Sequence, residues 1–193
     1  EAVQSLIAKC CGRRGEWLAR FNEAWNFSTT QTPEESWQIG TPEQRKAALQ
    51  ELRSTNPALA REWLQQTWDQ EDADTKTSFL SYLSVNIGAD DLPFLESLSA
   101  EKSKKVRDEA TQLLKMIPGS SVVAMYTEIL RQAVVLEKVK GLLGLSTKTA
   151  LRFELPSNID EAVFKTGIDK LSNKKEITDD EFIIYQLIQS TPT

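Results

Sequence analysis

The sequence predicts a mostly α-helical protein, an α-α superhelix of stacked repeats about 31 residues long, with a small β-hairpin near residues 133–156. Three observations support this prediction. Arg45, Lys76 and Arg107 follow one another at intervals of 31 residues. Residues of the kind that begin helices recur between the runs that these cations open. Near the C-terminal end, residues 149–155 instead alternate apolar and polar side chains, as a strand does.

The repeat is visible in three similar runs, at residues 45–52, 76–83 and 107–114. Each run has apolar residues at helical spacing. The same offset carries Trp63-Leu64 onto Phe94-Leu95. A period of this length with two helices per unit is typical of a stacked helical repeat, in which each unit buries its apolar face against its neighbours.

Before the repeats, the apolar periodicity predicts two helices, over residues 1–11 and from about Trp17 to Trp25. It places Cys10 and Trp17 in the core. Residues 26–41 are polar and predict a loop with one short turn at 33–37.

From residue 41 onward, the helix starts are marked by capping residues. Thr41-Pro42 followed by Gln44 has an N-cap, a proline at the first helical position and a capping-box glutamine. Asn56-Pro57 begins the next helix in the same way. Further helices are predicted to begin at Asp74, at Asp90 or Asp91, at Ser103, and at Ser120 or Ser121.

The pattern changes after about residue 132. Residues 133–140 are rich in β-branched side chains and fit either a strand or a continued helix. Residues 149–155 predict a strand, so the two runs form a hairpin if the first is also a strand. A helix near 160–166 and a last helix with the capping box Thr178 to Glu181 follow. We therefore divide the chain into a repeat domain, 1–131, and a small mixed α/β tail, 132–193, that packs on the stack or extends it.

The composition limits the functions to be considered. A net charge of −5 in 193 residues argues against nucleic acid and anionic membrane surfaces as partners. The absence of histidine removes the commonest general base and most zinc sites. Two adjacent cysteines make no disulfide framework, which predicts a reducing cytoplasm. We expect no enzyme activity, no cofactor and no metal. Because the chain starts at Glu1 and not at Met, we also expect a fragment of a longer repeat protein.

The units resemble HEAT-type repeats, in which the second helix opens with a Val-Arg pair followed by Ala and Leu at helical spacing. Val106-Arg107, Ala110 and Leu114 match that pattern best. The Arg45 and Lys76 copies lack the preceding valine. The resemblance implies a curved stack of helix pairs.

Most of the chain also resembles a bacterial family of unknown function with HEAT-like repeats. The matching pieces are Gly40-Thr-Pro-Glu43, Leu52-Arg-Ser-Thr-Asn-Pro57, Ala60-Arg-Glu-Trp-Leu64, Thr67-Trp68, Asp91-Leu-Pro-Phe-Leu-Glu96, Ser103-Lys-Lys-Val-Arg107 and Leu113-Leu-Lys-Met-Ile-Pro-Gly-Ser120. The resemblance implies protein partners, because genes of this family tend to lie beside those for a MoxR-type AAA ATPase, a von Willebrand A-domain protein and a SWIM zinc-finger protein. It carries over no catalytic residue.

The function that we expect is a non-enzymatic protein–protein interaction scaffold. The exposed polar residues of the second helices, with the unusually placed Trp37, form its expected partner-binding surface. These residues are Trp37, Arg45, Gln50, Arg53, Lys76, Ser81, Arg107 and Gln112. The alternative is a HEAT-like protein that binds nucleic acid or processes bases, which requires Arg45, Lys76, Lys105 and Arg107 to converge on one concave face.

Overall fold

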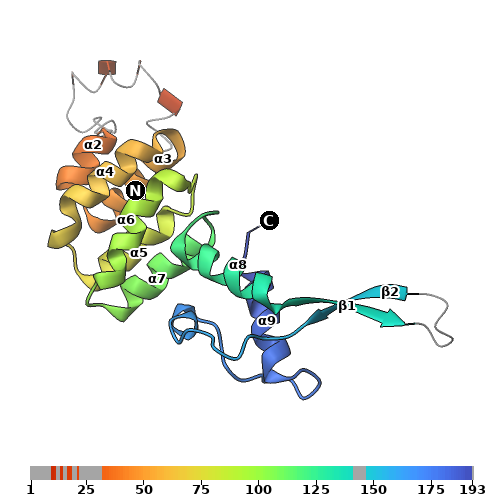
Figure 1. Ribbon diagram of the computed structural model, residues 1–193. Helices are drawn as coiled ribbons and strands as arrows, with labels where there is room; N and C mark the ends of the chain where they lie inside the picture. The colour runs from red at the N-terminus through yellow and green to blue at the C-terminus, as the bar shows by residue number, and fades with distance from the viewer. Residues whose placement is uncertain are drawn as a thin grey trace. The chain divides into compact units, whose positions relative to one another are not determined.

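The computed structural model describes residues 32–140 and 147–192, together with Cys10, Cys11, Arg14, Trp17, Leu18 and Phe21. This part of the chain is mostly helical and carries one small antiparallel sheet, as the sequence predicts (Figure 1). The helices predicted over 1–11 and 17–25 lie largely outside the described residues. Cys10 and Trp17 were expected in the core, and that expectation is wrong, because both side chains are exposed.

The chain forms two compact units, Glu1–Glu51 and Leu52–Thr193. The domain boundary predicted at 131/132 does not coincide with this division and stays a prediction. Helix α3 (Pro42–Thr55) begins in the first unit and ends in the second.

In the first unit, the segment expected as a loop with a turn forms helix α2 (Pro33–Ile39). Thr32 and Glu35 make a capping box at its start, since each side chain accepts a hydrogen bond from the other residue's backbone N–H, at 3.2 and 2.9 Å. The capping box predicted at the start of α3 is confirmed by reciprocal bonds between Thr41 and Gln44, at 2.8 and 3.3 Å.

The second unit contains six more α-helices, several short 3₁₀ turns and two strands among its described residues. In chain order they are α4 (Pro57–Thr67), η2 (Trp68–Gln70), α5 (Ala73–Tyr82), η3 (Ala89–Asp91), α6 (Leu92–Ser97), η4 (Leu98–Ala100), α7 (Lys104–Lys115), α8 (Ser121–Ala133), β1 (Val134–Lys140), β2 (Thr147–Phe153), η5 (Val163–Thr166) and α9 (Asp179–Gln189).

The capping residues read from the sequence begin most of these helices. Asn56, Ser120 and Thr178 each accept a hydrogen bond from a first-turn amide of α4, α8 and α9. Asp74 does not cap α5. Asp72 does, because its carboxylate accepts bonds from the amides of Asp74 and Thr75, at 2.9 and 2.8 Å.

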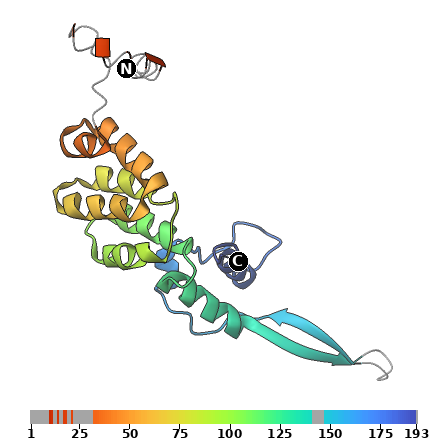
Figure 2. The same cartoon turned by 90° about the horizontal axis from the view of Figure 1, so that it is seen from above.

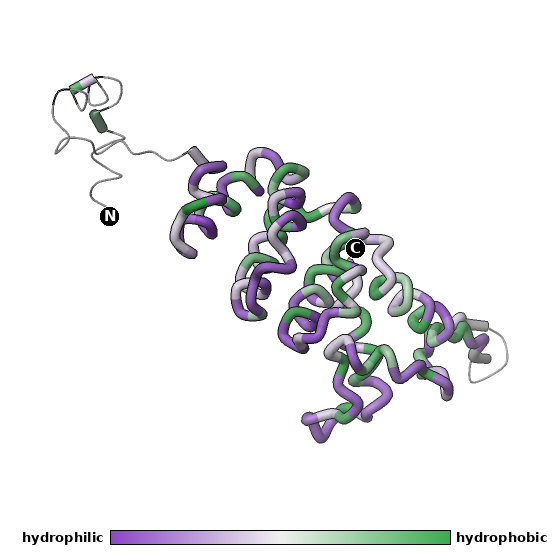
Figure 3. The backbone as a smooth tube through the Cα atoms, turned by 90° about the vertical axis from the view of Figure 1, so that its left-hand side faces the viewer, coloured by the Kyte–Doolittle hydropathy of each residue, from purple (hydrophilic) through white to green (hydrophobic). Residues whose placement is uncertain are grey.

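The core of the second unit lies between the helices. Helix α5 packs along α7, and α6 and α8 also pack against α7. Apolar and polar residues alternate along these helices, so each turns one side inward (Figure 3). Trp63 and Phe94, which the 31-residue offset aligns, are both buried, as predicted. Other fully buried side chains include Leu64, Phe79, Leu80, Leu83, Leu95, Val106, Tyr126 and Leu187.

The repeat pattern is interrupted after α8. One 31-residue step beyond Arg107 lies Lys138, where a further second helix would begin, but this residue belongs to β1. Helix α9 instead packs against α8, although residues 134–178 separate the two helices in sequence. The hairpin and the loop after it are therefore inserted between two helices that form a pair.

Strands β1 and β2 form the predicted hairpin. Their antiparallel register places Val134 opposite Phe153 and Leu136 opposite Leu151. The ambiguity over residues 133–140 is thus resolved: α8 ends at Ala133 and a strand follows at once. Figures 1 and 2 both show the hairpin extending away from the end of α8.

Candidate protein-binding surface

Three residues of the predicted partner surface have exposed side chains. They are Gln50, Ser81 and Gln112. Gln112 lines a groove of about 850 Å³ between α6, α7, α8 and residues 162–167. The other five predicted residues hold the helices together, as follows.

Trp37 is buried and packs under Arg45. The Arg45 guanidinium carbon lies 4.5 Å from the centre of a Trp37 ring, and Arg45 Nε donates a hydrogen bond to the Trp37 carbonyl at 3.1 Å. Only 4% of Trp37 is exposed, so its prediction as an exposed anchor is wrong. The indole is covered because α2 turns it inward and the cation eight residues later lies across its ring.

The same arrangement recurs one repeat later. Lys76 Nζ lies 5.0 Å from the centre of a Trp68 ring and donates to Glu101 Oε1 at 3.0 Å. The Trp68 indole N–H donates to the same oxygen at 2.7 Å. Bonds from Lys76 and Trp68 lower the pKa of Glu101 below its ordinary value. Trp37 and Trp68 are 31 residues apart, and that spacing was the sequence signal for a structural role of Trp37.

The third cation of the series, Arg107, also bonds within the chain. Its Nη1 donates to the carbonyls of Glu101 and Lys102, which fixes the turn between η4 and α7. Next to it, Lys105 Nζ lies 2.9 Å from Asp74 Oδ1 and joins α7 to α5. The cations on which the nucleic-acid alternative depends therefore have partners inside the protein.

Arg53 is completely buried, so its prediction as a surface residue is wrong. Its guanidinium donates to four backbone carbonyls and to both oxygens of Asp91. The four carbonyls are those of Pro57, Leu83, Val85 and Asn86, at 2.8 to 3.2 Å. All of its N–H groups are thereby satisfied, which a buried arginine requires.

Asp91 completes this buried network. Beside Arg53, its carboxylate accepts from Arg61 Nη1 at 2.7 Å and from the Gly88 amide at 3.1 Å. Burial acts to raise the pKa of Asp91, but the bonds from Arg53, Arg61 and Gly88 outweigh it and lower that pKa below its ordinary value. The network ties the end of α3 to the loop between α5 and α6.

The surface that is free to bind lies at the other end of the second unit. The hairpin turns apolar side chains outward: Leu136 is 69% exposed and Leu151 57%, with Val134 and Phe153 beside them. Helix α9 exposes Tyr185 and Ile188, at 54% and 51%. Contiguous exposed apolar residues of this kind mark interaction sites on folded proteins.

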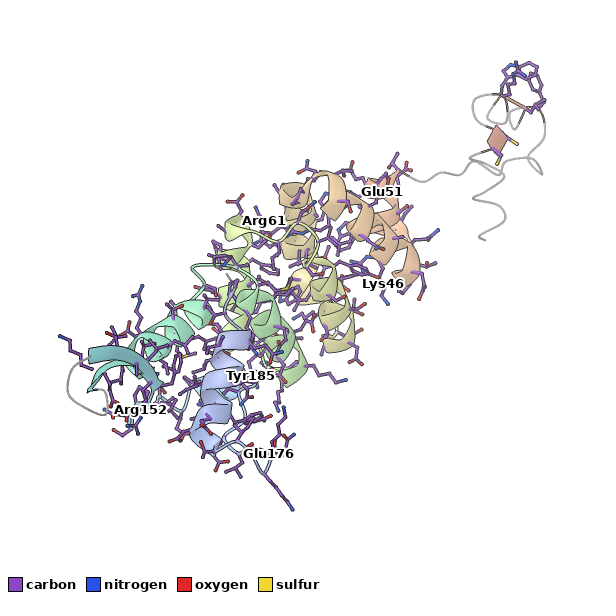
Figure 4. The ribbon with its side chains drawn as sticks, turned by 90° about the vertical axis from the view of Figure 1, so that its right-hand side faces the viewer. Lys46, Glu51, Arg61, Arg152, Glu176 and Tyr185 are labelled. Atoms are coloured by element: carbon purple, nitrogen blue, oxygen red, sulfur yellow. The ribbon has the colours of Figure 1, made fainter. Side chains whose placement is uncertain are left out.

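A groove of about 840 Å³ lies between these two elements, and we call it the β2–α9 groove. Figure 4 labels Arg152 on one side of it and Tyr185 on the other. Its lining residues are Leu151, Arg152, Phe153, Glu154, Leu155, Thr178, Asp180, Glu181, Ile184, Tyr185 and Ile188. The only sequence signal for the groove was the alternation in residues 149–155.

The polar rim of the groove is acidic. Arg152 pairs with Glu137 across the sheet and with Glu154 on its own strand, at 3.6 and 3.1 Å. On the opposite wall, Asp180 and Glu181 open helix α9. Bonds from the Thr178 amide and hydroxyl lower the pKa of Glu181, so this carboxylate is ionised at neutral pH.

Within the described residues, no group of three or more potential ligands is placed to bind a metal ion. None of the helices in that part of the chain has the length and apolar character that a membrane span requires.

Comparisons with curated proteins and with solved structures gave no match. A family model does match, over residues 1–193. The chain belongs to this family, DUF5691, a family of unknown function.

Proposed function

We propose that this protein is a non-enzymatic, cytoplasmic protein-binding module, and that partners dock in the β2–α9 groove. The observation that carries the proposal is the apolar surface of the hairpin and α9. Four exposed apolar side chains lie on one face of the sheet, and two more lie on the helix beside it. Leaving this surface in water is unfavourable by roughly 25 cal/mol for each Å² that a partner would cover.

The remaining helices serve as a support in this proposal. Stacked pairs of HEAT-like character hold the groove on a rigid base, because cations and buried networks lock each pair to the next. The network of Arg53 and Asp91 and the contact of Lys105 with Asp74 each join segments that are far apart in sequence. A rigid support lowers the entropic cost of binding.

The first candidate partners are the MoxR-type ATPase and the von Willebrand A-domain protein that the family resemblance implies. The test measures binding of each purified candidate to the wild-type chain and to a Leu151→Ser, Tyr185→Ser double variant by biolayer interferometry. We expect at least one candidate to bind, and the double variant to weaken that binding by about tenfold or more, since each lost apolar contact contributes about 1–2 kcal/mol.

A matched control changes two exposed apolar residues outside the groove, Met116→Ser and Leu171→Ser. This variant should bind like the wild type. Equal loss in both variants, or partner binding that neither variant affects, would contradict docking in the groove.

A further inference from the structure

The β2–α9 groove runs along the outer edge of a strand. Its lining includes five consecutive residues, 151–155, whose side chains point alternately to the two faces of the sheet. A groove that touched one face of the sheet alone would be lined by every second residue. Both the backbone edge of β2 and the side of α9 therefore border the same space.

The backbone of β2 presents unpaired hydrogen-bonding groups to that space. The Glu154 amide donates to the Ala133 carbonyl at 2.8 Å, so this is a hydrogen-bonded pair of the ladder. Such pairs alternate with non-hydrogen-bonded ones, whose N–H and C=O groups point away from the partner strand. Leu151 and Phe153 belong to the second kind. Within the described residues, the sheet has two strands, and nothing hydrogen bonds to this edge.

An isolated two-stranded hairpin with an open edge is only marginally stable in water, and an open edge readily pairs with another chain. Here the edge has features of a built site. Apolar side chains flank it on both sides, from β2 and from α9, and give alternate residues of an added strand places to pack.

The charges indicate which chain would pair with the edge. Arg152 is neutralised by Glu137 and Glu154, which leaves the α9 wall with Asp180 and Glu181. Asp180 bonds to no described side chain. An acidic wall favours a segment that carries lysine or arginine. A second copy of this chain, at net charge −5, is disfavoured by the same field.

We propose that the β2–α9 groove binds an extended partner segment as a third strand on the outer edge of β2. The segment alternates apolar residues, which pack against Leu151, Phe153, Tyr185 and Ile188, with residues that include lysine or arginine facing Asp180 and Glu181. Its backbone exchanges hydrogen bonds with Leu151 and Phe153. This is β-strand addition, in which main-chain bonds give affinity and alternate side chains give specificity. The inference rests on the proposed function and names the chemistry of the partner.

The experiment selects peptides of about ten residues, a length that one strand spans, from a random displayed library against the full chain. The best peptide is then resynthesised with one backbone amide N-methylated at a time, and each version is titrated by fluorescence anisotropy. We expect enriched peptides to be basic with alternating apolar residues. N-methylation of every second amide should weaken binding by about tenfold or more, since each lost bond is worth about 1–1.5 kcal/mol and the methyl group blocks the edge.

Two matched variants test the same geometry from the protein side. Leu151→Pro removes an N–H that points to the outer edge, where proline is tolerated, and should abolish peptide binding while the hairpin persists by NMR. Asp180→Lys with Glu181→Lys should weaken basic peptides by about tenfold and favour acidic ones. Met116→Ser, outside the groove, should change neither.

Three outcomes would overturn the inference, and they are distinguishable. Groove-dependent peptides whose N-methyl sensitivity lacks a two-residue period would exclude strand addition but keep the proposed function. Enriched peptides without basic residues would remove the proposed partner chemistry. Concentration-dependent self-association in sedimentation that Leu151→Pro abolishes would make a second copy the occupant. Selections with no peptide sensitive to Leu151→Ser and Tyr185→Ser would contradict the proposed function itself.

Discussion

Leu151 lies directly opposite Leu136 in the hairpin ladder, and more than half of each side chain is exposed. A non-hydrogen-bonded pair brings two such side chains close together, so they form one apolar surface on the hairpin. The relationship separates binding from stability, because residues that are exposed in the folded chain add little to its free energy of unfolding.

Replacing both leucines by threonine should therefore leave the free energy of unfolding within about 0.5 kcal/mol of the wild type. Threonine keeps the β-branched character that strands favour. Urea denaturation followed by circular dichroism measures the change. Leu187→Ala, at a fully buried position on α9, is the contrast and should cost about 2–5 kcal/mol. A loss above 2 kcal/mol for the threonine variant would mean that the chain itself covers this surface.

Asp91→Asn should be among the most destabilising polar substitutions in the chain. It removes the charge that Arg53 and Arg61 share and leaves a buried guanidinium without its counter-ion, which costs about 3–5 kcal/mol. The midpoint of urea denaturation reports the loss. The exposed pair of Lys105 and Asp74 provides the control, and Asp74→Asn should shift that midpoint hardly at all. Equal effects of the two substitutions would contradict the role given to the buried network.

Stability should also fall in acid. The folded pKa values of Asp91 and Glu101 lie below their ordinary values of 3.8 and 4.5. Their stabilisation is therefore complete above those values and is lost as the pH falls through the lower, folded pKa values. Urea midpoints measured from about pH 6 to about pH 2.5 should decline below about pH 4.5. Glu101→Gln should flatten the upper part of that decline, and an unchanged profile would count against the ion pair with Lys76.

The contact between Trp68 and Glu101 should be measurable apart from the burial of the indole. Trp68→Phe keeps an aromatic ring against Phe94 but removes the N–H that donates to Glu101, so it should cost about 1–2 kcal/mol. Trp68→Ala should cost about 3–5 kcal/mol, because it also empties the site. In the Glu101→Gln background the phenylalanine substitution should cost less, and strict additivity there would exclude the interaction.

Much of the helical architecture follows from the sequence, because helices depend on local signals. Capping residues such as Asn56 and Thr178 act within one turn of the chain, and the apolar offset from Trp63 to Phe94 reports stacking directly. The alternation of residues 149–155 was likewise local, and it predicted β2.

The candidate surface was predicted poorly, because exposure depends on contacts that are distant in sequence. Arg53 is polar and lies on a helix, yet it is buried since Asp91, far along the chain, comes to meet it. Trp37 looked isolated until its repeat partner Trp68 was considered. Conversely, the apolar face of the hairpin indicated a core, and nothing local shows that no helix covers it.

Two glycines with positive φ should be costly to replace, although there is room for a side chain at both. Gly119 and Gly167 have φ of 86° and 90°, and a Cβ at Gly167 would meet only the ends of Gln112 and Lys115, at 3.7 Å. Alanine at either position should cost about 1–2 kcal/mol from backbone strain alone. Gly88 is the matched control, because its backbone is extended and a Cβ there meets nothing within 4 Å. Gly88→Ala should be neutral or stabilise the chain by up to about 1 kcal/mol through the unfolded state. Thermal denaturation of the three variants tests this order, and a Gly167→Ala protein as stable as Gly88→Ala would show that the segment after η5 is free to adopt another backbone conformation.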